Sequence, residues 1–263
     1  GTHSGRSGLR WLAMVFSKHD NIFEISEPYP LHESFYRYTT WNKLPIDHSG
    51  FFGILQARFN KIWEKHDTIF YASPWLGFGM EDVDKYLKPN SYIYIIRNPE
   101  EVVNSLSSKG WYSQKVTKSN FSLVSGIQSG LNNFHHQFSR ISPSGAEFSY
   151  WNNLTAIGKC AWFWSQINNS LCRFFSSIDE KKVFKFKLED IDQNYNAYLS
   201  YSEVFDLIPR ISKGDFLSVK TELPNKGIIN RSSESWSSDE KKEFDENTFD
   251  FMQVYYDIQT TIK

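Results

Sequence analysis

The sequence predicts an α/β fold in which a mostly parallel central sheet carries helices on both faces. Segments with strand character alternate along the chain with segments that have the period of amphipathic helices. The strand Tyr92–Ile96 consists only of aromatic and β-branched residues, which is typical of a strand covered on both faces. The segment 157–178 carries apolar residues spaced alternately by four and three, which predicts a long helix facing the core.

The remaining elements follow from the same patterns, taken along the chain. The other expected strands are three short apolar runs: 21–26, 68–72 and 183–188. The other expected helices cover 9–18, 51–65, 80–88, a segment from Pro99, and a closing segment to about Ile258. Ser237 and Glu240 have the spacing of a capping box at the start of that closing helix. Residues 31–50 are polar and aromatic without a clear period.

The segment 113–156 is rich in Ser, Asn and Gly and has few periodic apolar positions. A loop of this length in a compact domain is usually functional or disordered. The alternatives are a lid over a substrate and an insertion without a role, and the sequence does not favour either. With 263 residues, the chain is expected to form a single domain, 1–263.

Composition limits the class of protein. The net charge of −1 argues against nucleic acid as a main partner. No apolar run approaches the roughly 20 residues of a membrane span. The two cysteines, Cys160 and Cys172, provide no disulfide framework, and we therefore expect a reduced, cytoplasmic setting. No group of residues has the spacing of metal ligands, so a metal is not expected.

A stretch rich in glycine and serine, from Ser4 to Gly8, leads directly into an apolar helical run. Glycine permits a tight turn and lets the backbone approach a ligand closely. The helix start that follows presents unpaired N–H groups and a partial positive charge, which together favour phosphate or sulfate. Arg6 and Arg10 add full charges beside it. We therefore expect an anion-binding loop, fed by a first strand that is nearly absent from the sequence.

A second stretch joins a strand to a helix start. Arg97 follows the strand Tyr92–Ile96 directly and therefore lies at its carboxyl end, where open α/β sheets bind ligands. Asn98 is a favourable N-cap, and Pro99 suits the first helical position. Ser105 stands two helical turns beyond the arginine, where its hydroxyl could face the same pocket.

Together the two stretches resemble the paired signatures of sulfotransferases that use 3′-phosphoadenosine 5′-phosphosulfate (PAPS). That family holds the 5′-phosphosulfate with a Pro-Lys-Ser-Gly-Thr-Thr-Trp loop. It holds the 3′-phosphate with a strand ending in Arg-Asn-Pro and a Ser eight residues after the Arg. Ser7, Gly8 and Trp11 match the loop, Arg6 stands at its lysine, and Leu9 and Arg10 replace the two threonines. The second signature is matched without a gap by Arg97, Asn98, Pro99 and Ser105.

A third family element, Arg-Lys-Gly followed by a Trp, resembles Asn225, Lys226 and Gly227, although Trp236 comes later than usual. The three elements occur in order and bracket most of the chain. The resemblance implies a P-loop-like sulfotransferase fold with a truncated first strand. It also implies PAPS as co-substrate, without a metal, and a small-molecule, carbohydrate or peptide acceptor bearing a hydroxyl or amine.

The resemblance also assigns roles to residues. The backbone from Ser7 through Trp11, with Gly8, Leu9 and Arg10 between them, would wrap the 5′-phosphosulfate. Arg6 would stabilise the charge that develops on the bridging oxygen. Arg97 would grip the 3′-phosphate in bidentate fashion, completed by Ser105, Lys226 and Gly227. Trp11 stands where the family places a ring on the adenine. For Arg97 taken alone, the alternative is an ordinary surface ion pair.

The acceptor must lose a proton as it attacks sulfur, so the site needs a base. The Lys-Thr-His-x-Pro histidine of cytosolic members is missing, because Tyr71 to Pro74 stand in its place. Tyrosylprotein and glycosaminoglycan sulfotransferases use a Glu after the strand that follows the loop helix, and Glu27 stands there. The alternatives are a solvated Glu27 without a role and Glu24. Lone histidines are expected to be ordinary: His32, His48 and His66. The pair His135 and His136 could touch substrate.

Two other classes stay open. A P-loop phosphotransferase would want Gly-x-x-x-x-Gly-Lys-Ser/Thr, and no lysine follows Gly8 here. A non-catalytic nucleotide-binding module is left open by the two replaced threonines and the missing histidine. Aromatic residues around 29–41 and 134–151 favour a ring-bearing or sugar substrate if they line a site, but they could equally belong to the core. The oligomeric state is not predicted.

Overall fold

The computed structural model describes residues 2–3, 8–113, 138, 140–189, 195–221 and 232–258. Within them the chain is a mixed α/β fold with two small parallel sheets. One sheet has the order β1 (Thr2–His3), β4 (Tyr92–Ile96), β5 (Val183–Lys187), and the other pairs β2 (Ile22–Ser26) with β3 (Thr68–Ala72). Every strand of the sequence prediction is present within a residue or two of its expected bounds.

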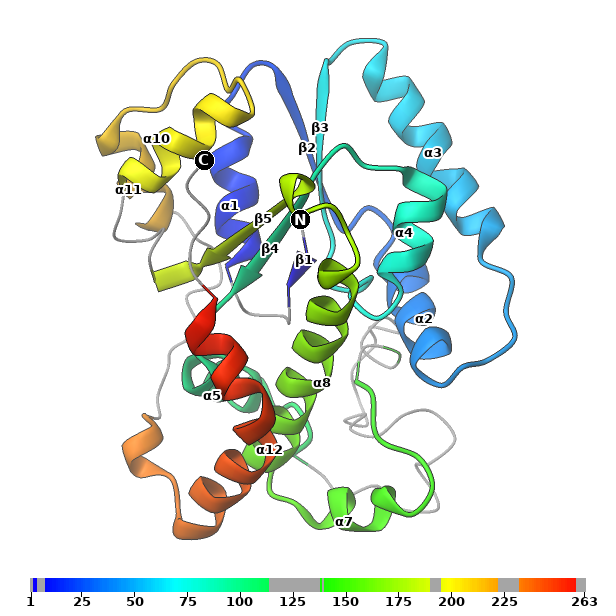
Figure 1. The fold of residues 1–263 in the computed structure, drawn as a ribbon, viewed down its shortest axis with the longest axis vertical. Helices are drawn as coiled ribbons and strands as arrows, with labels where there is room; N and C mark the ends of the chain where they lie inside the picture. Colours follow the sequence, from blue (N-terminus) through cyan, green and yellow to red (C-terminus); the bar gives the residue numbers. More distant parts are fainter. Residues whose placement is uncertain are drawn as a thin grey trace.

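The helices surround these strands (Figure 1). In chain order the α-helices are α1 (Leu9–Phe16), α2 (Pro30–Trp41), α3 (Ser49–Trp63), α4 (Met80–Leu87), α5 (Pro99–Ser107), α7 (Glu147–Asn153), α8 (Ala156–Ser176), α10 (Tyr195–Val204), α11 (Lys213–Thr221) and α12 (Ser238–Asp257). Two short 3-10 helices are η1 (Glu180–Lys182) and η2 (Ser233–Ser235). The capping box expected at Ser237 and Glu240 is confirmed at the start of α12.

Strand β4 divides the interior into two apolar cores, because its successive side chains point to opposite faces. Tyr92, Tyr94 and Ile96 lie in one core with residues of α3, α4, α5, α8 and α12. Ile93 and Ile95 lie in the other, with residues of α1, α10 and α11. Figure 1 shows α1, α10 and α11 grouped together, away from α3 and α4. The expectation of helices on both faces is therefore confirmed for this strand.

Helix α8 is the centre of the larger core and packs against both α5 and α12 (Figure 1). The stripe predicted from the sequence is buried: Cys160, Trp164, Ile167 and Leu171 are each 0% exposed. Burying a large apolar side chain stabilises the fold by about 1.5–3 kcal/mol. Both cysteines lie on α8 and are free thiols, as the absence of a disulfide framework predicts.

Helix α2 was not predicted, since residues 31–50 show no apolar period. Its buried face explains why, because it carries polar side chains: Glu33, Ser34, Arg37 and Thr39 are each at most 2% exposed. A helix that buries polar groups has no apolar stripe to recognise. Pro30 at its first position was the available signal, since proline is favoured there.

The predicted lid or insertion at 113–156 falls largely outside the described residues, which omit 114–137 and 139. Its end contains α7, which the sequence did not predict. The single-domain interpretation stays a prediction. Across the described part of the chain, none of the helices has the length and apolar character to cross a membrane.

Candidate functional site

The first motif is described only from Gly8 onward, so Arg6 and Ser7 lie outside the described residues. Gly8 is the N-cap of α1 and has φ +90°, in the left-handed region that favours glycine. A Cβ added to it would lie 2.6 Å from Cδ1 of Leu188, which follows β5. The backbone angle therefore favours glycine at position 8, and an added Cβ would also require the Leu188 side chain to move.

The next three residues of the motif differ in exposure. Arg10 is exposed, whereas Leu9 and Trp11 are each 3% exposed. The Trp11 ring packs edge-on against Phe216 of α11, with 5.4 Å between ring centroids. Its Nε1 is buried without a hydrogen-bond partner among the described residues. The adenine-facing role of Trp11 stays a prediction, and the structure gives this ring a core contact.

Arg97 leaves the carboxyl end of β4 and is 22% exposed. Its Nε donates to Glu101 Oε2 at 2.6 Å, and its NH2 group also contacts that oxygen. The surface ion pair, which was the alternative for this arginine, is therefore present. Ser105 lies one helical turn beyond Glu101 on α5 and is 4% exposed, whereas Arg97 precedes the N-cap of this helix.

The pairing of β1 with β4 fixes where in the sheet the two anion-binding motifs begin. Strand β1 is parallel to β4, and His3 lies beside Ile95. The chain therefore leaves β1 at the same edge of the sheet where Arg97 leaves β4. Asn98, the N-cap of α5, donates its backbone N–H to Glu189 Oε1 at 2.8 Å, and Glu189 follows Leu188, the contact of Gly8.

Asn98 caps α5 as predicted. Its side-chain oxygen accepts the N–H groups of Glu100 and Glu101 at 2.9 and 3.3 Å. Lys226 and Gly227, which the resemblance adds to the 3′-phosphate site, lie outside the described residues.

The proposed base, Glu27, directly follows β2 and is exposed. Its φ is +43°, which is uncommon for a residue with a side chain and costs roughly 1–3 kcal/mol. Its N–H donates to the Ala72 carbonyl at 3.0 Å, and its Oε2 accepts the Trp75 Nε1–H at 3.0 Å. Glu27 is therefore held from two sides by the end of β3 and the residues that follow it.

A buried group of side chains that the sequence did not predict lies beneath Glu27. Arg37, on α2, is 2% exposed, and its guanidinium lies 4.8 Å from the centre of the Trp75 ring. Arg37 Nε donates to the Trp75 carbonyl at 3.3 Å, and its NH2 group donates to the Pro74 carbonyl. Burial lowers the pKa of the Arg37 guanidinium to about 10, so the group stays charged at neutral pH.

Glu33, also on α2, is 0% exposed. Its Oε2 accepts the Ser73 hydroxyl at 2.5 Å, and its Oε1 accepts the Tyr29 N–H at 3.3 Å. Burial, with a smaller contribution from the nearby Glu27, raises the pKa of the Glu33 carboxyl to about 7 against the opposing hydrogen bonds. Buried carboxyls with shifted pKa values are frequent at functional sites.

The other candidate bases have local contacts. Glu24 accepts the hydroxyl of Ser26, its neighbour on the same face of β2. The three lone histidines each contact an aromatic ring: His32 contacts Phe51, His48 contacts Tyr36, and His66 contacts Phe23. His135 and His136 lie outside the described residues.

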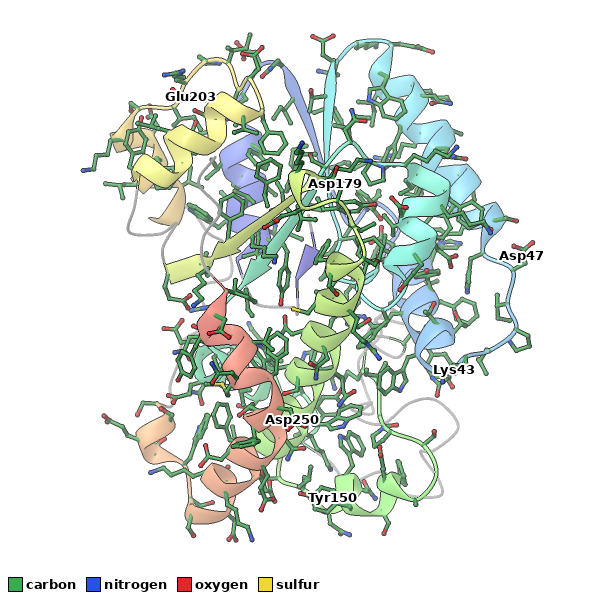
Figure 2. All side chains as sticks on the ribbon, in the orientation of Figure 1. Lys43, Asp47, Tyr150, Asp179, Glu203 and Asp250 are labelled. Carbon is green, nitrogen blue, oxygen red and sulfur yellow. The ribbon has the colours of Figure 1, made fainter. Side chains whose placement is uncertain are left out.

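The aromatic residues near 148–151 divide between surface and core. Trp151 is 2% exposed and packs against Tyr112, with 5.4 Å between ring centroids. Tyr150 is 57% exposed and lies on α7 at the periphery of the molecule (Figure 2). The Tyr150 hydroxyl donates to Glu246 of α12 at 3.3 Å, so both rings have contacts away from Glu27 and Arg97.

A cavity of about 590 Å³ lies between the two sheets. Its lining includes the first residue of three strands, Ile22 of β2, Thr68 of β3 and Tyr92 of β4, together with Phe184, the second residue of β5. The lining also continues along β3 to Tyr71 and beyond this strand to Ser73. A second cavity, of about 290 Å³, lies between Glu100 and α12. Neither is lined by Glu27, Gly8 or Arg97.

Over the described ranges of the chain, the side chains of His, Cys, Asp and Glu form no group of three or more that could hold a metal ion. No protein-family model, no curated protein and no solved structure matches the chain.

Proposed function

We propose that the protein is a sulfotransferase that transfers the sulfonate group of PAPS to a hydroxyl or amine of an acceptor. One observation carries the proposal: β1 and β4 are adjacent and parallel, so the loop that leaves His3 and the side chain of Arg97 start from the same sheet edge. The two anion-binding motifs, 91 positions apart when counted from Arg6 to Arg97 (97 − 6 = 91), then serve one nucleotide that has a phosphate at each end of its ribose.

We also infer that the two sheets are parts of one parallel central sheet of the P-loop-like type. Residues of β2, β3, β4 and β5 line the same cavity, and the pairings β2–β3 and β4–β5 are both parallel. This cavity lies between the two sheets, and in the described part of β1 Thr2 pairs with Tyr94 and His3 with Ile95.

The reaction follows from the chemistry of PAPS. The acceptor oxygen or nitrogen forms a bond to sulfur, and its proton passes to the Glu27 carboxylate. The bond between sulfur and the bridging oxygen breaks, and adenosine 3′,5′-bisphosphate leaves. Arg6 and the backbone N–H groups from Ser7 to Trp11 stabilise the charge on the bridging oxygen. Arg97 binds the 3′-phosphate, together with Ser105, Lys226 and Gly227.

Two structural features support Glu27 as the base. It lies at the carboxyl end of a parallel strand, the edge at which α/β sheets bind ligands. Its carboxylate has one oxygen engaged by the Trp75 Nε1–H, and the side chain is exposed, so the other oxygen is accessible to an acceptor.

Ligand-induced thermal stabilisation tests the proposal. Adenosine 3′,5′-bisphosphate at about 100 times its dissociation constant adds about 2.7 kcal/mol and should raise Tm by roughly 5–10 °C without magnesium. ATP, with or without magnesium, should not do so. A Tm that responds only to ATP with magnesium would instead favour a P-loop phosphotransferase.

A matched pair of variants locates the binding site. Arg97→Ala removes the proposed 3′-phosphate ligand together with its ion pair to Glu101. Arg210→Ala removes a comparable exposed ion pair, to Glu203, far from both motifs in the sequence. The bisphosphate response should be lost in the first variant and kept in the second. Equal responses in both would exclude Arg97 as a ligand.

A further inference from the structure

Trp75 connects two loops at the carboxyl ends of neighbouring strands. Strands β2 and β3 are parallel, and Ser26 lies beside Ala72 at their last paired position. Glu27 follows the first strand, and Trp75 stands three residues beyond the second (75 − 72 = 3). The indole N–H donates to Glu27 Oε2 at 3.0 Å. This contact therefore joins residues 48 positions apart in the sequence.

The Trp75 side chain is fixed on several sides. Its backbone N–H donates to Ser73 Oγ at 3.2 Å, and the same hydroxyl donates to Glu33. Its carbonyl accepts Arg37 Nε, and the Arg37 guanidinium lies over its ring. A cation over a desolvated aromatic face stabilises the arrangement by about 2 kcal/mol or more. Trp75 is 8% exposed, so its indole has little freedom to turn away from Glu27.

The type of donor matters for a base. An arginine or lysine paired with Glu27 would add a positive charge and make the carboxylate a weaker proton acceptor. The indole N–H is a neutral donor with no acceptor function, so it orients one oxygen without neutralising the charge. Arg37 does contribute charge, but it approaches the face of the Trp75 ring and the carbonyls of the loop, as its described contacts show.

We propose that Trp75 is a positioning residue that holds the Glu27 carboxylate in the orientation required for proton removal from the acceptor. The inference rests on the proposed sulfotransferase function and assigns to it a residue that the sequence motifs do not contain. The strained backbone at Glu27 fits this role, because such conformations persist where surrounding contacts hold them.

Trp75→Phe tests the proposal, since it removes the N–H donor and keeps an aromatic ring next to Arg37. With labelled PAPS and a panel of a phenol, a simple alcohol, a glucosamine oligosaccharide and a tyrosine peptide, kcat should fall roughly 10- to 100-fold. KM for PAPS and the bisphosphate response should not change. Trp63→Phe, at a tryptophan that is 51% exposed, is the matched control and should keep full activity.

The pH profile separates positioning from a merely structural role. A hydrogen bond to a carboxylate favours its charged form, so the loss of the donor should move the acidic limb of kcat to higher pH. The other titratable groups that interact with Glu27 are Glu33 and Arg37 on α2 and Tyr71 on β3. Glu33, Arg37 and Tyr71 are all retained in both Trp75→Phe and the control Trp63→Phe.

A measurement without turnover covers the case in which Trp75→Phe does not fold. The chain has nine tryptophans, and at one fixed pH the indole ¹⁵N–¹H signal of Trp75 should differ between the wild type and Glu27→Gln, because its acceptor changes from a carboxylate to an amide. Absence of bisphosphate binding and of sulfonate transfer in the wild type would remove the proposed function, and this inference with it. Turnover that is unaffected by Trp75→Phe, or a Trp75 signal insensitive to Glu27→Gln, would overturn the inference alone.

Discussion

The carboxylate of Glu33 and the hydroxyl of Ser73 lie 2.5 Å apart, in a hydrogen bond that joins α2 to the end of β3. Glu33 is fully buried, whereas Glu27, the proposed base, is exposed. Two carboxyl groups thus occupy opposite environments beside the same loop, with Trp75 between Ser73 and Glu27 in the hydrogen-bond chain. Because Glu33 is buried, its ionisation should change the free energy of unfolding.

The stability of the protein should fall as Glu33 loses its proton. Burial raises its pKa from 4.5 to about 7, so the folded state binds more protons than the unfolded state between these values. The stabilisation is complete below pH 4.5 and is lost as the pH rises through 7. The free energy of unfolding should decrease by about 3 kcal/mol over that interval from this group.

Glu33→Gln should remove this part of the pH dependence, because glutamine does not titrate and can still accept the Ser73 hydroxyl. Denaturant unfolding at pH 4.5, 5.5, 6.5 and 7.5 measures it. Glu64→Gln, at an exposed position at the end of α3, is the matched control and should leave the slope unchanged. An identical slope in wild type and Glu33→Gln would contradict the assignment.

A side chain at position 8 should destabilise the fold. Gly8→Ala places a left-handed backbone on alanine and pushes a Cβ into Leu188, so we expect a loss of about 2–4 kcal/mol. Gly145 has a similar backbone angle, φ +67°, and a Cβ added there would have no atom within 4 Å. Gly145→Ala should therefore lower the free energy of unfolding by only about 1–2 kcal/mol. Thermal unfolding compares them, and adding Leu188→Ala to Gly8→Ala should recover part of the difference.

Glu101 should compete with the nucleotide for Arg97. Their ion pair must open when Arg97 binds a phosphate, and exposed pairs of this kind contribute about 0.2–1 kcal/mol. Glu101→Gln should therefore tighten binding of adenosine 3′,5′-bisphosphate by roughly two- to fivefold in calorimetric titration. Glu203→Gln, which removes the partner of Arg210, should have no effect. Weaker binding in Glu101→Gln would show that Arg97 needs this carboxylate for its position.

The sequence predicted those elements whose burial follows an apolar period. Strand Tyr92–Ile96 and the stripe of α8 lie where they were expected, because apolar side chains decide both. Helix α2 was missed because its buried face contains Glu33 and Arg37, whose burial is stabilised by hydrogen bonds that no local pattern encodes. The role of Trp75 was also not predictable from local patterns, because its contact with Glu27 depends on the pairing of β2 with β3.

The candidate site was predictable only in its local parts. The N-cap role of Asn98 and the position of Glu27 after a strand follow from neighbouring residues and are present. The side-chain partners of Trp11 and Arg97 were not predictable in the same way. Trp11 packs against Phe216, on a helix that the sequence patterns did not indicate, and Arg97 pairs with a glutamate of its own helix.

Transfer of labelled sulfonate from PAPS to any member of the acceptor panel, followed by mass spectrometry of the product, tests the central claim most directly. We expect a sulfated product and adenosine 3′,5′-bisphosphate in equal amounts without added magnesium. Glu27→Gln should lower kcat by roughly 10²–10⁴-fold while bisphosphate binding persists. A chain that binds neither PAPS nor the bisphosphate, and forms no sulfated product with any acceptor, would contradict the account.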